Sequence, residues 1–416
     1  MDRHGTGAAS GLRALGCGYL FKPVLRGSYQ TDHALGRLLP PRLWLPTCPP
    51  DSCAGELLVV LESEDRSRRW PLLWADDRGL HVGVDLERAI AALQREAFRP
   101  PLVPPITARL PFNYSRLPAW VKGLAELALS RLAKPQLIQF PSSPCDFGAD
   151  FLQALACRLS GFSERPTWLG RHSIAIALSH DVDTAWVLRH QDMLQRIVEM
   201  EDRHGFKSTW HVVADYLGTA AVEESLEWLS RQGHEIASHG DNHDTRHPFL
   251  SVQRRRARWD RILPHARRLG MVGFRAAWLG RTDGFFDDMA ADGLFRYDTS
   301  VPNSCVEGAV ASRTGCTSCR PYFIRPRLVE LPLVWMLESL VDQSLWCAFE
   351  QSIASTAAAG GLFTLLMHPQ PNKSANPRML ALYERALDIL ARQEGAWKCR
   401  QADVAQRIAE GGGRPS

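Results

Sequence analysis

Two aspartates separated by one residue are the first positions in this chain at which chemistry could be done. Asp181 and Asp183 follow the apolar run 174–178, which is typical of a buried strand. If the strand continued through them, both side chains would leave on one face, and two negative charges would share one pocket. Such a pair favours a bound cation, although aspartates are also common in solvated turns at strand ends.

A histidine pair supplies further ligands for a cation. His239 and His243 follow the strand-like run 235–238, and three residues separate them. A helical turn would therefore direct both imidazoles to one ion. Two histidines and a carboxylate suit Zn²⁺, and also Co²⁺, Ni²⁺ or Mn²⁺, with positions left for water and a substrate oxygen. Either histidine alone would more simply cap or pack a loop, but beside the two aspartates the pair predicts a metal site.

Three more polar residues stand at the ends of strand-like runs. Arg275 follows an apolar pair and could hold a carboxylate by a bidentate contact. Asp298 follows the run 295–297, and His368 follows the run 362–367, where it is placed to donate a proton. Each could instead be a surface ion pair, a turn residue or a buried polar group. Their occurrence at successive strand ends favours a single hydrolytic site.

The elements that would position these residues begin near residue 171, where short apolar runs alternate with helical periodicity. Repeated strand and helix units predict parallel strands with right-handed crossovers. About seven units favour a closed or nearly closed α/β barrel, in which the carboxyl ends of the strands meet at one mouth. The predicted strands are 174–179, 208–213, 235–238, 273–277, 295–297, 327–333, 362–367 and 396–399, and the predicted helices are 186–201, 223–232, 249–269, 340–359 and 378–393.

The chain before the barrel has a different character. Proline-rich patches at 39–50 and 99–105 alternate with a strand-like run at 57–61 and a helical pattern at 117–132. We find no catalytic constellation there, and we take Asp146, Asp150 and Arg158, around a predicted helix at 147–159, as surface charges. The predicted organisation is an α+β accessory domain of unknown role at 1–165, a barrel at 171–408 and a flexible tail at 409–416.

Composition limits the class of protein. The 416 residues are 45% hydrophobic and 23% charged with a net charge of +4, which is typical of a globular protein and gives no reason to expect nucleic acid. The basic run of Arg254, Arg255, Arg256 and Arg258 follows a helical apolar pattern, so we expect a solvated helix face rather than a phosphate site. No apolar run reaches signal-peptide or membrane-span length. We therefore expect a cytoplasmic protein.

Ten cysteines are scattered through the chain, and without an export signal we expect most to be reduced and buried. Cys316 and Cys319, with Cys305 upstream, could hold a structural zinc ion. A fourth ligand at typical spacing is missing, so an incidental loop pair is the simpler interpretation.

Taken together, five motifs resemble the motif series of the polysaccharide deacetylase family, also called NodB-homology or carbohydrate esterase family four. They are His180-Asp-Val-Asp183, His239-x-x-x-His243, Arg275-x-x-Trp278, Tyr297-Asp-Thr-Ser300 and Leu366-Met-His368. The resemblance covers residues 171–406 and depends on order, spacing and strand-end placement. It implies a distorted (β/α)7-type barrel that removes acetyl groups from N-acetylated sugars with one divalent metal ion, usually Zn²⁺.

The sequence departs from the family pattern in two places. The first motif is His-Asp-Val-Asp rather than Phe-Asp-Asp, as in bacterial branches similar to surface-polysaccharide biosynthesis proteins, and the usual proline after Arg275 is missing. The resemblance implies a role for each matched position: Asp181 as general base, Asp183, His239 and His243 as metal ligands, His368 as general acid, Arg275 orienting Asp181, Asp298 tuning His368, and Trp278 contacting substrate.

We therefore predict a hydrolase of carbon–nitrogen bonds other than peptide bonds, which deacetylates a saccharide in bacterial surface polysaccharide metabolism. A deacylase of a small amide or O-acetyl ester and a non-catalytic carbohydrate-binding relative are the alternatives. The sequence leaves open the sugar, the native metal and the oligomeric state.

Overall fold

A computed structural model gives the fold, and it describes residues 56–62, 69–76, 79–82, 86–96, 148–150, 152–153, 168, 172–304 and 315–411. The Pro-rich patches at 39–50 and 99–105, the helical pattern at 117–132 and Cys305 lie outside these ranges.

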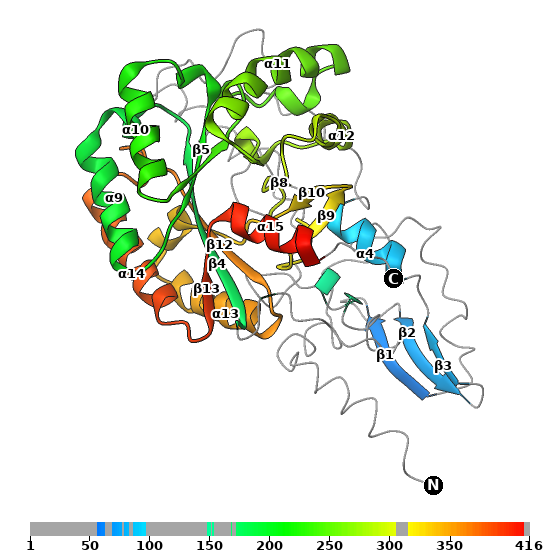
Figure 1. Ribbon diagram of the computed structural model, residues 1–416. Helices are drawn as coiled ribbons and strands as arrows, with labels where there is room; N and C mark the ends of the chain where they lie inside the picture. The colour runs from blue at the N-terminus through cyan, green and yellow to red at the C-terminus, as the bar shows by residue number, and fades with distance from the viewer. Residues whose placement is uncertain are drawn as a thin grey trace, which may run out of the picture.

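One curled, mostly parallel sheet forms the centre of the molecule (Figure 1). Its strands are β4 (Ile174–Val182), β5 (Thr209–Val212), β6 (Glu235–Ser238), β7 (Gly273–Phe274), β8 (Tyr297–Asp298), β9 (Tyr322–Arg325), β10 (Leu328–Glu330), β11 (Trp335–Met336), β12 (Leu362–Met367) and β13 (Ala396–Lys398). They are ordered β11-β12-β4-β5-β6-β7-β8-β10-β9, with β13 also paired to β4. Every pairing is parallel except that of β9 with β10. The predicted α/β fold of the distorted barrel type is confirmed, as a half-barrel whose edge strands are β9 and β11.

Helices connect the strands and cover the sheet (Figure 1). They are α8 (Trp186–Arg189), α9 (Gln191–Arg203), α10 (Ala220–Arg231), α11 (Val252–Leu269), α12 (Asp283–Asp292), α13 (Leu345–Ala358), α14 (Pro377–Ala391) and α15 (Gln401–Gly411), with 3₁₀ turns η3 (Ala214–Tyr216), η4 (His247–Phe249), η5 (Ala277–Leu279) and η6 (Leu337–Val341). The predicted strand at 273–277 stops at residue 274, because the chain then turns into η5. Helices α12 and α15 were not predicted, and α15 includes residues 409–411 of the predicted tail.

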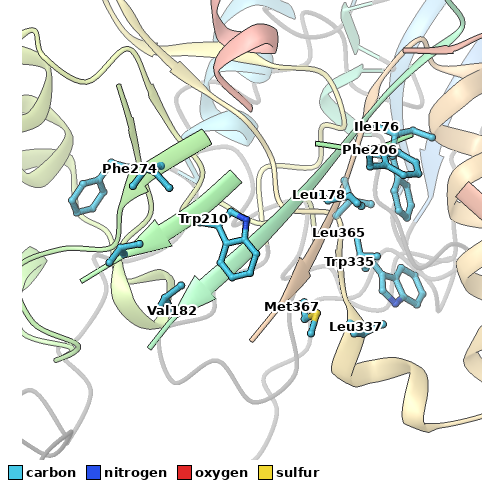
Figure 2. Close-up of a cluster of buried hydrophobic side chains, with 14 of the residues drawn as sticks. Ile176, Leu178, Val182, Phe206, Trp210, Phe274, Trp335, Leu337, Leu365 and Met367 are labelled. Atoms are coloured by element: carbon cyan, nitrogen blue, oxygen red, sulfur yellow. The ribbon is translucent and has the colours of Figure 1, made fainter. Parts of the chain in front are cut away.

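The apolar runs that predicted strands form the core. All nine residues of β4 are buried, which explains why it reads as a continuous apolar run rather than an alternating one. Figure 2 shows side chains of β4, β5, β7 and β12, among them Leu178, Trp210, Phe274 and Leu365, in one buried cluster. Position 273 requires glycine for a steric reason, since a Cβ atom there would lie 1.9 Å from Cζ of Tyr297.

The described part of the N-terminal region contains β1 (Glu56–Glu62), β2 (Arg69–Asp76) and β3 (Gly79–Val82) in an antiparallel sheet, followed by α4 (Leu86–Gln94). It contacts the barrel through polar groups whose contacts were not predicted from the sequence. Asp150 is not a surface charge: it is 4% exposed and accepts hydrogen bonds from the Ser318 hydroxyl at 2.5 Å and the Cys319 amide at 2.8 Å. Asp146 and Arg158 lie outside the described residues.

The basic run on α11 also differs from expectation. Arg254 and Arg256 are exposed, but Arg255 and Arg258 are each only 9% exposed and are paired with carboxylates. A run of arginines does not reveal which of them face inward, because that depends on acidic partners from other elements.

Cys316 and Cys319 are free thiols in the core and belong to no group of three metal-binding side chains within the described ranges. Among the helices of those ranges, none is long and apolar enough to cross a membrane.

Candidate active site

The carboxyl ends of β4, β6, β7 and β12 bring most of the predicted site residues together. Asp181 lies within β4 and Asp183 directly after it, while His239 follows β6, where its amide donates to the Val212 carbonyl at 2.8 Å. Arg275 follows β7 and His368 follows β12. Parallel strands end at one edge of a sheet, so residues up to 187 positions apart in the chain converge there.

Asp183, His239 and His243 form a group whose ligand atoms all lie within 4.8 Å of one another. Oδ1 of Asp183 is 2.9 Å from Nε2 of His243 and 3.4 Å from Nε2 of His239. This Oδ1 is buried and has no hydrogen-bond partner of good geometry in the described part of the chain. Nδ1 of His239 lies 2.9 Å from the Arg275 carbonyl, an arrangement that leaves Nε2 for a metal. The donor set therefore fits a divalent cation such as Zn²⁺.

Asp181 is held apart from this group by Arg275. Nη1 of Arg275 donates to Oδ1 of Asp181 at 2.8 Å, and the guanidinium, which is fully buried, also bonds the Thr299 carbonyl and hydroxyl. Burial raises the pKa of Asp181, but Arg275 and then His239 outweigh burial and lower it well below its usual range. Oδ2 of Asp181 remains 3.8 Å from Nε2 of His239, so an ionised carboxylate faces the predicted metal position.

His368 has a carboxylate partner that the sequence analysis missed. Nδ1 of His368 is 3.1 Å from Oε1 of Glu338, which also accepts hydrogen bonds from the His368 amide and the Ser374 hydroxyl. Burial and Lys373 lower the pKa of His368, but the carboxylates of Glu338 and Asp183 outweigh them and raise it. Glu338 lies in η6 rather than at the end of a predicted strand, so its place in the sequence gives no signal of this contact.

Asp298 lies in a different set of contacts. Its carboxylate accepts hydrogen bonds from the amide and hydroxyl of Ser300, at 2.7 and 2.9 Å, and pairs with Glu330. Burial raises the pKa of both carboxyl groups, and the neighbouring Asp298 carboxylate raises that of Glu330 further, well above its usual range. The expectation that Asp298 tunes His368 is not supported by these contacts, because Glu338 occupies the position beside His368.

Two further residues approach the candidate metal ligands. Trp278 lies in η5, three residues after Arg275, and its ring centroid is 6.2 Å from that of His243. Lys373, which the sequence analysis did not single out, places Nζ 3.4 Å from Oδ2 of Asp183. Nothing in the polar sequence around Lys373 marks it, since its contact depends on how the loop after β12 folds back.

The loop that carries the histidine pair is fixed from α11. Arg258 donates to both carboxylate oxygens of Asp244 at 2.5 Å and, more weakly, to Oδ1 of Asp241 at 3.4 Å, and Arg261 also pairs with Asp241. The two aspartates flank His243 in the sequence. Arg258, a buried member of the predicted basic run, thus holds the loop that carries the candidate metal ligands.

The fold and site together define an α/β half-barrel with a group that could hold a metal ion, an arginine-bound aspartate and a glutamate-bound histidine at the strand ends. No family model matches the sequence, and no curated protein matches it. The chain is similar in structure to a protein from Mycobacterium smegmatis described as a polysaccharide deacetylase, with 18% identity, 60% of this chain and 94% of that chain covered, and a TM-score of 0.47. A protein from Pseudomonas aeruginosa PAO1 described in the same way gives 15% identity, 61% and 97% coverage and a TM-score of 0.45. The Puue allantoinase gives 15% identity, 60% and 94% coverage and a TM-score of 0.45. Two of these neighbours are described as polysaccharide deacetylases, the family whose motif series residues 171–406 resemble.

Proposed function

We propose that this chain is a metal-dependent hydrolase that removes N-acetyl groups from a saccharide in bacterial surface polysaccharide metabolism. The observation that carries the proposal is the side-by-side placement of a three-residue metal group with an arginine-bound Asp181 and a glutamate-bound His368. This combination supplies a cation, a base and an acid at one edge of the sheet.

Asp183, His239 and His243 would hold one divalent cation, most simply Zn²⁺, with Co²⁺, Ni²⁺ or Mn²⁺ as alternatives. When bound, the cation polarises an acyl carbonyl and makes a water molecule more acidic. The roles of the ligands follow from the burial of the Asp183 carboxylate and from the two imidazole nitrogens that face it.

Asp181 would accept the proton of the attacking water, and Arg275 keeps this carboxylate ionised and oriented. His368 would donate its proton to the amine as the carbon–nitrogen bond breaks, so that one amide and one water give acetate and a free amine. The lowered pKa of Asp181 favours its ionised form and the raised pKa of His368 favours its protonated form, which are the forms that these roles require. Trp278, beside His243, would contact the sugar.

We also propose that the substrate is a cytoplasmic precursor of a surface polysaccharide. Residues 1–165 would form an accessory domain. The neighbouring alternatives keep the same site but change the substrate to a small amide or an O-acetyl ester, or they remove catalysis and retain carbohydrate binding.

The test measures acetate release by the purified full-length chain from N-acetylhexosamine oligomers, sugar nucleotides, simple amides and O-acetyl esters in parallel. We expect release from the N-acetylated saccharides, and Asp181→Asn is expected to lower turnover by about 10²- to 10⁴-fold while metal content is retained. His239→Ala is expected to lose the metal, whereas the exposed Asp192→Asn is a matched control that should change neither. A fully active Asp181→Asn variant would overturn the assignment of the base, and activity on amides or esters alone would select the alternative substrates.

A further inference from the structure

A buried ion pair joins the N-terminal region to the loop after β7. Nε and Nη2 of Arg281 donate to the two carboxylate oxygens of Glu96, each at 2.7 Å. Both residues are 2% exposed. Glu96 follows α4, which Figure 1 shows beside β9 at the rim of the barrel, while Arg281 stands three residues after Trp278. The pair is bidentate, the geometry in which an arginine holds a carboxylate most specifically.

Arg281 in turn holds the part of the loop that carries Trp278. Its Nη1 donates to the Leu279 carbonyl at 2.8 Å. Trp278 and Leu279 both have left-handed backbone conformations, with φ of 58° and 53°. Bulky residues rarely adopt this conformation, and it persists only where the surrounding structure imposes it. The hydrogen bond from Arg281 is one such constraint, and it acts on the residue next to Trp278.

Glu96 is itself fixed to the barrel rather than attached only through Arg281. Its Oε1 accepts a hydrogen bond from the Gly315 amide at 3.0 Å, and the Tyr322 hydroxyl donates to the neighbouring Gln94 carbonyl at 2.7 Å. The carboxylate therefore has a defined position against which Arg281 can be held. Without it, the buried guanidinium would lose its bidentate partner, and a buried charge without a partner is strongly unfavourable.

We propose that Glu96 and Arg281 are positioning residues, through which the N-terminal region holds the loop 276–281 and sets the position of Trp278 at the active-site mouth. The support of the loop stands on the contacts above, and only its consequence for substrate binding rests on the proposed function. The N-terminal region would then be part of the working site rather than a separately attached domain.

Hydrogen exchange of the full-length protein, followed by mass spectrometry, tests the support directly. In Glu96→Gln we expect amides of the peptide spanning 276–282 to exchange at least about tenfold faster, since the Leu279 and Gly280 amides are hydrogen-bonded within this turn. Asp150→Asn is the matched control, because Asp150 also joins the N-terminal region to the barrel but contacts residues 318 and 319. Unchanged exchange at 276–282 in Glu96→Gln, or equal acceleration there in Asp150→Asn, would overturn the proposal.

A double variant, Glu96→Met with Arg281→Met, covers the case in which Glu96→Gln does not fold. Replacing both partners of a buried pair by apolar residues leaves stability near that of the wild type. The bond to the Leu279 carbonyl is still lost, so exchange at 276–282 should stay fast at a near-wild-type Tm, and wild-type exchange would count against the proposal.

Activity provides the second readout. With an N-acetylglucosamine oligomer, Glu96→Gln should raise KM at least about fivefold and leave kcat within about twofold, because Trp278 moves while Asp181 and His368 do not. An unchanged KM in an active protein would refute the link to Trp278. If the wild type releases no acetate at all, the proposed function fails, and the exchange experiment still decides whether the loop is held.

Discussion

Arg258 offers a sharp test of the candidate metal site, because it touches no candidate ligand. It lies on α11 and binds Asp244 and Asp241, which flank His243. We expect Arg258→Met to weaken divalent metal binding by displacing the loop that carries the histidine pair. Arg258→Lys should give an intermediate loss, since lysine keeps the charge but lacks the planar fork that matches a carboxylate.

The expected losses of stability and of metal affinity in Arg258→Met follow from the contacts of Arg258. Arg258 makes two charge-assisted hydrogen bonds of 2.5 Å to Asp244, each worth about 1.5–3 kcal/mol. Burial raises the pKa of Asp244, but Arg258 outweighs burial and lowers it, so Arg258→Met removes the charged partner that stabilises this buried carboxylate. Breaking such a pair costs about 3–5 kcal/mol of stability. Groups that orient metal ligands typically account for about 10- to 100-fold in metal affinity.

Calorimetric titration of the metal-free full-length protein with Zn²⁺ and Co²⁺ measures this affinity without depending on any substrate. Arg255→Met is the matched control: Arg255 lies on the same helix, is equally buried, and pairs with Asp288 at 2.6 Å. Both variants should unfold more easily, but only Arg258→Met should lose about 10- to 100-fold in metal affinity. Metal binding within about twofold of the wild type in Arg258→Met, or an equal loss in Arg255→Met, would refute the reasoning.

Three further predictions concern neighbouring residues. In Glu338→Gln, the pKa of His368 should fall, because burial and Lys373 are then opposed by one carboxylate fewer. The protonated donor is therefore lost at lower pH, and the alkaline limb of the kcat profile should move to lower pH. An unmoved limb would exclude Glu338 as the partner of the acid. In Lys373→Met, removal of an ammonium 3.4 Å from Oδ2 of Asp183 should tighten Zn²⁺ binding by about two- to fivefold in the same titration, since such a partly exposed ion pair is worth at most about 1 kcal/mol. Weaker binding would show that Lys373 does not compete with the metal ion for that carboxylate. In Glu201→Gln, loss of the fully buried contact of 2.6 Å to His180 should lower the free energy of unfolding by about 3–5 kcal/mol in a denaturant titration, and a loss below about 1 kcal/mol would show that this contact does not stabilise β4.

The sequence by itself determined the elements in which a local pattern and the tertiary environment agree. Strands β6 and β12 have the predicted bounds. In β12 five of the six residues are apolar and all six are buried, which is the pattern of a strand covered on both faces of a parallel sheet. The same logic placed Asp181, His239, Arg275 and His368 at strand ends, and a parallel sheet brings such ends to one edge. Residue type and spacing therefore indicated a group of two histidines and a carboxylate, and the resemblance to the family motif series selected Asp183 from the two aspartates.

Only the tertiary structure decided which charged residues stand beside these groups. Glu338 rather than Asp298 contacts His368, because η6 packs beside the end of β12 although it lies 30 residues earlier in the chain. Arg258 and Arg255 are buried, and Asp150 is not a surface charge, because acidic or polar partners from distant elements satisfy them. Apolar periodicity reports which face of an element is buried, whereas the pairing of buried charges depends on side chains that meet only after the chain has folded.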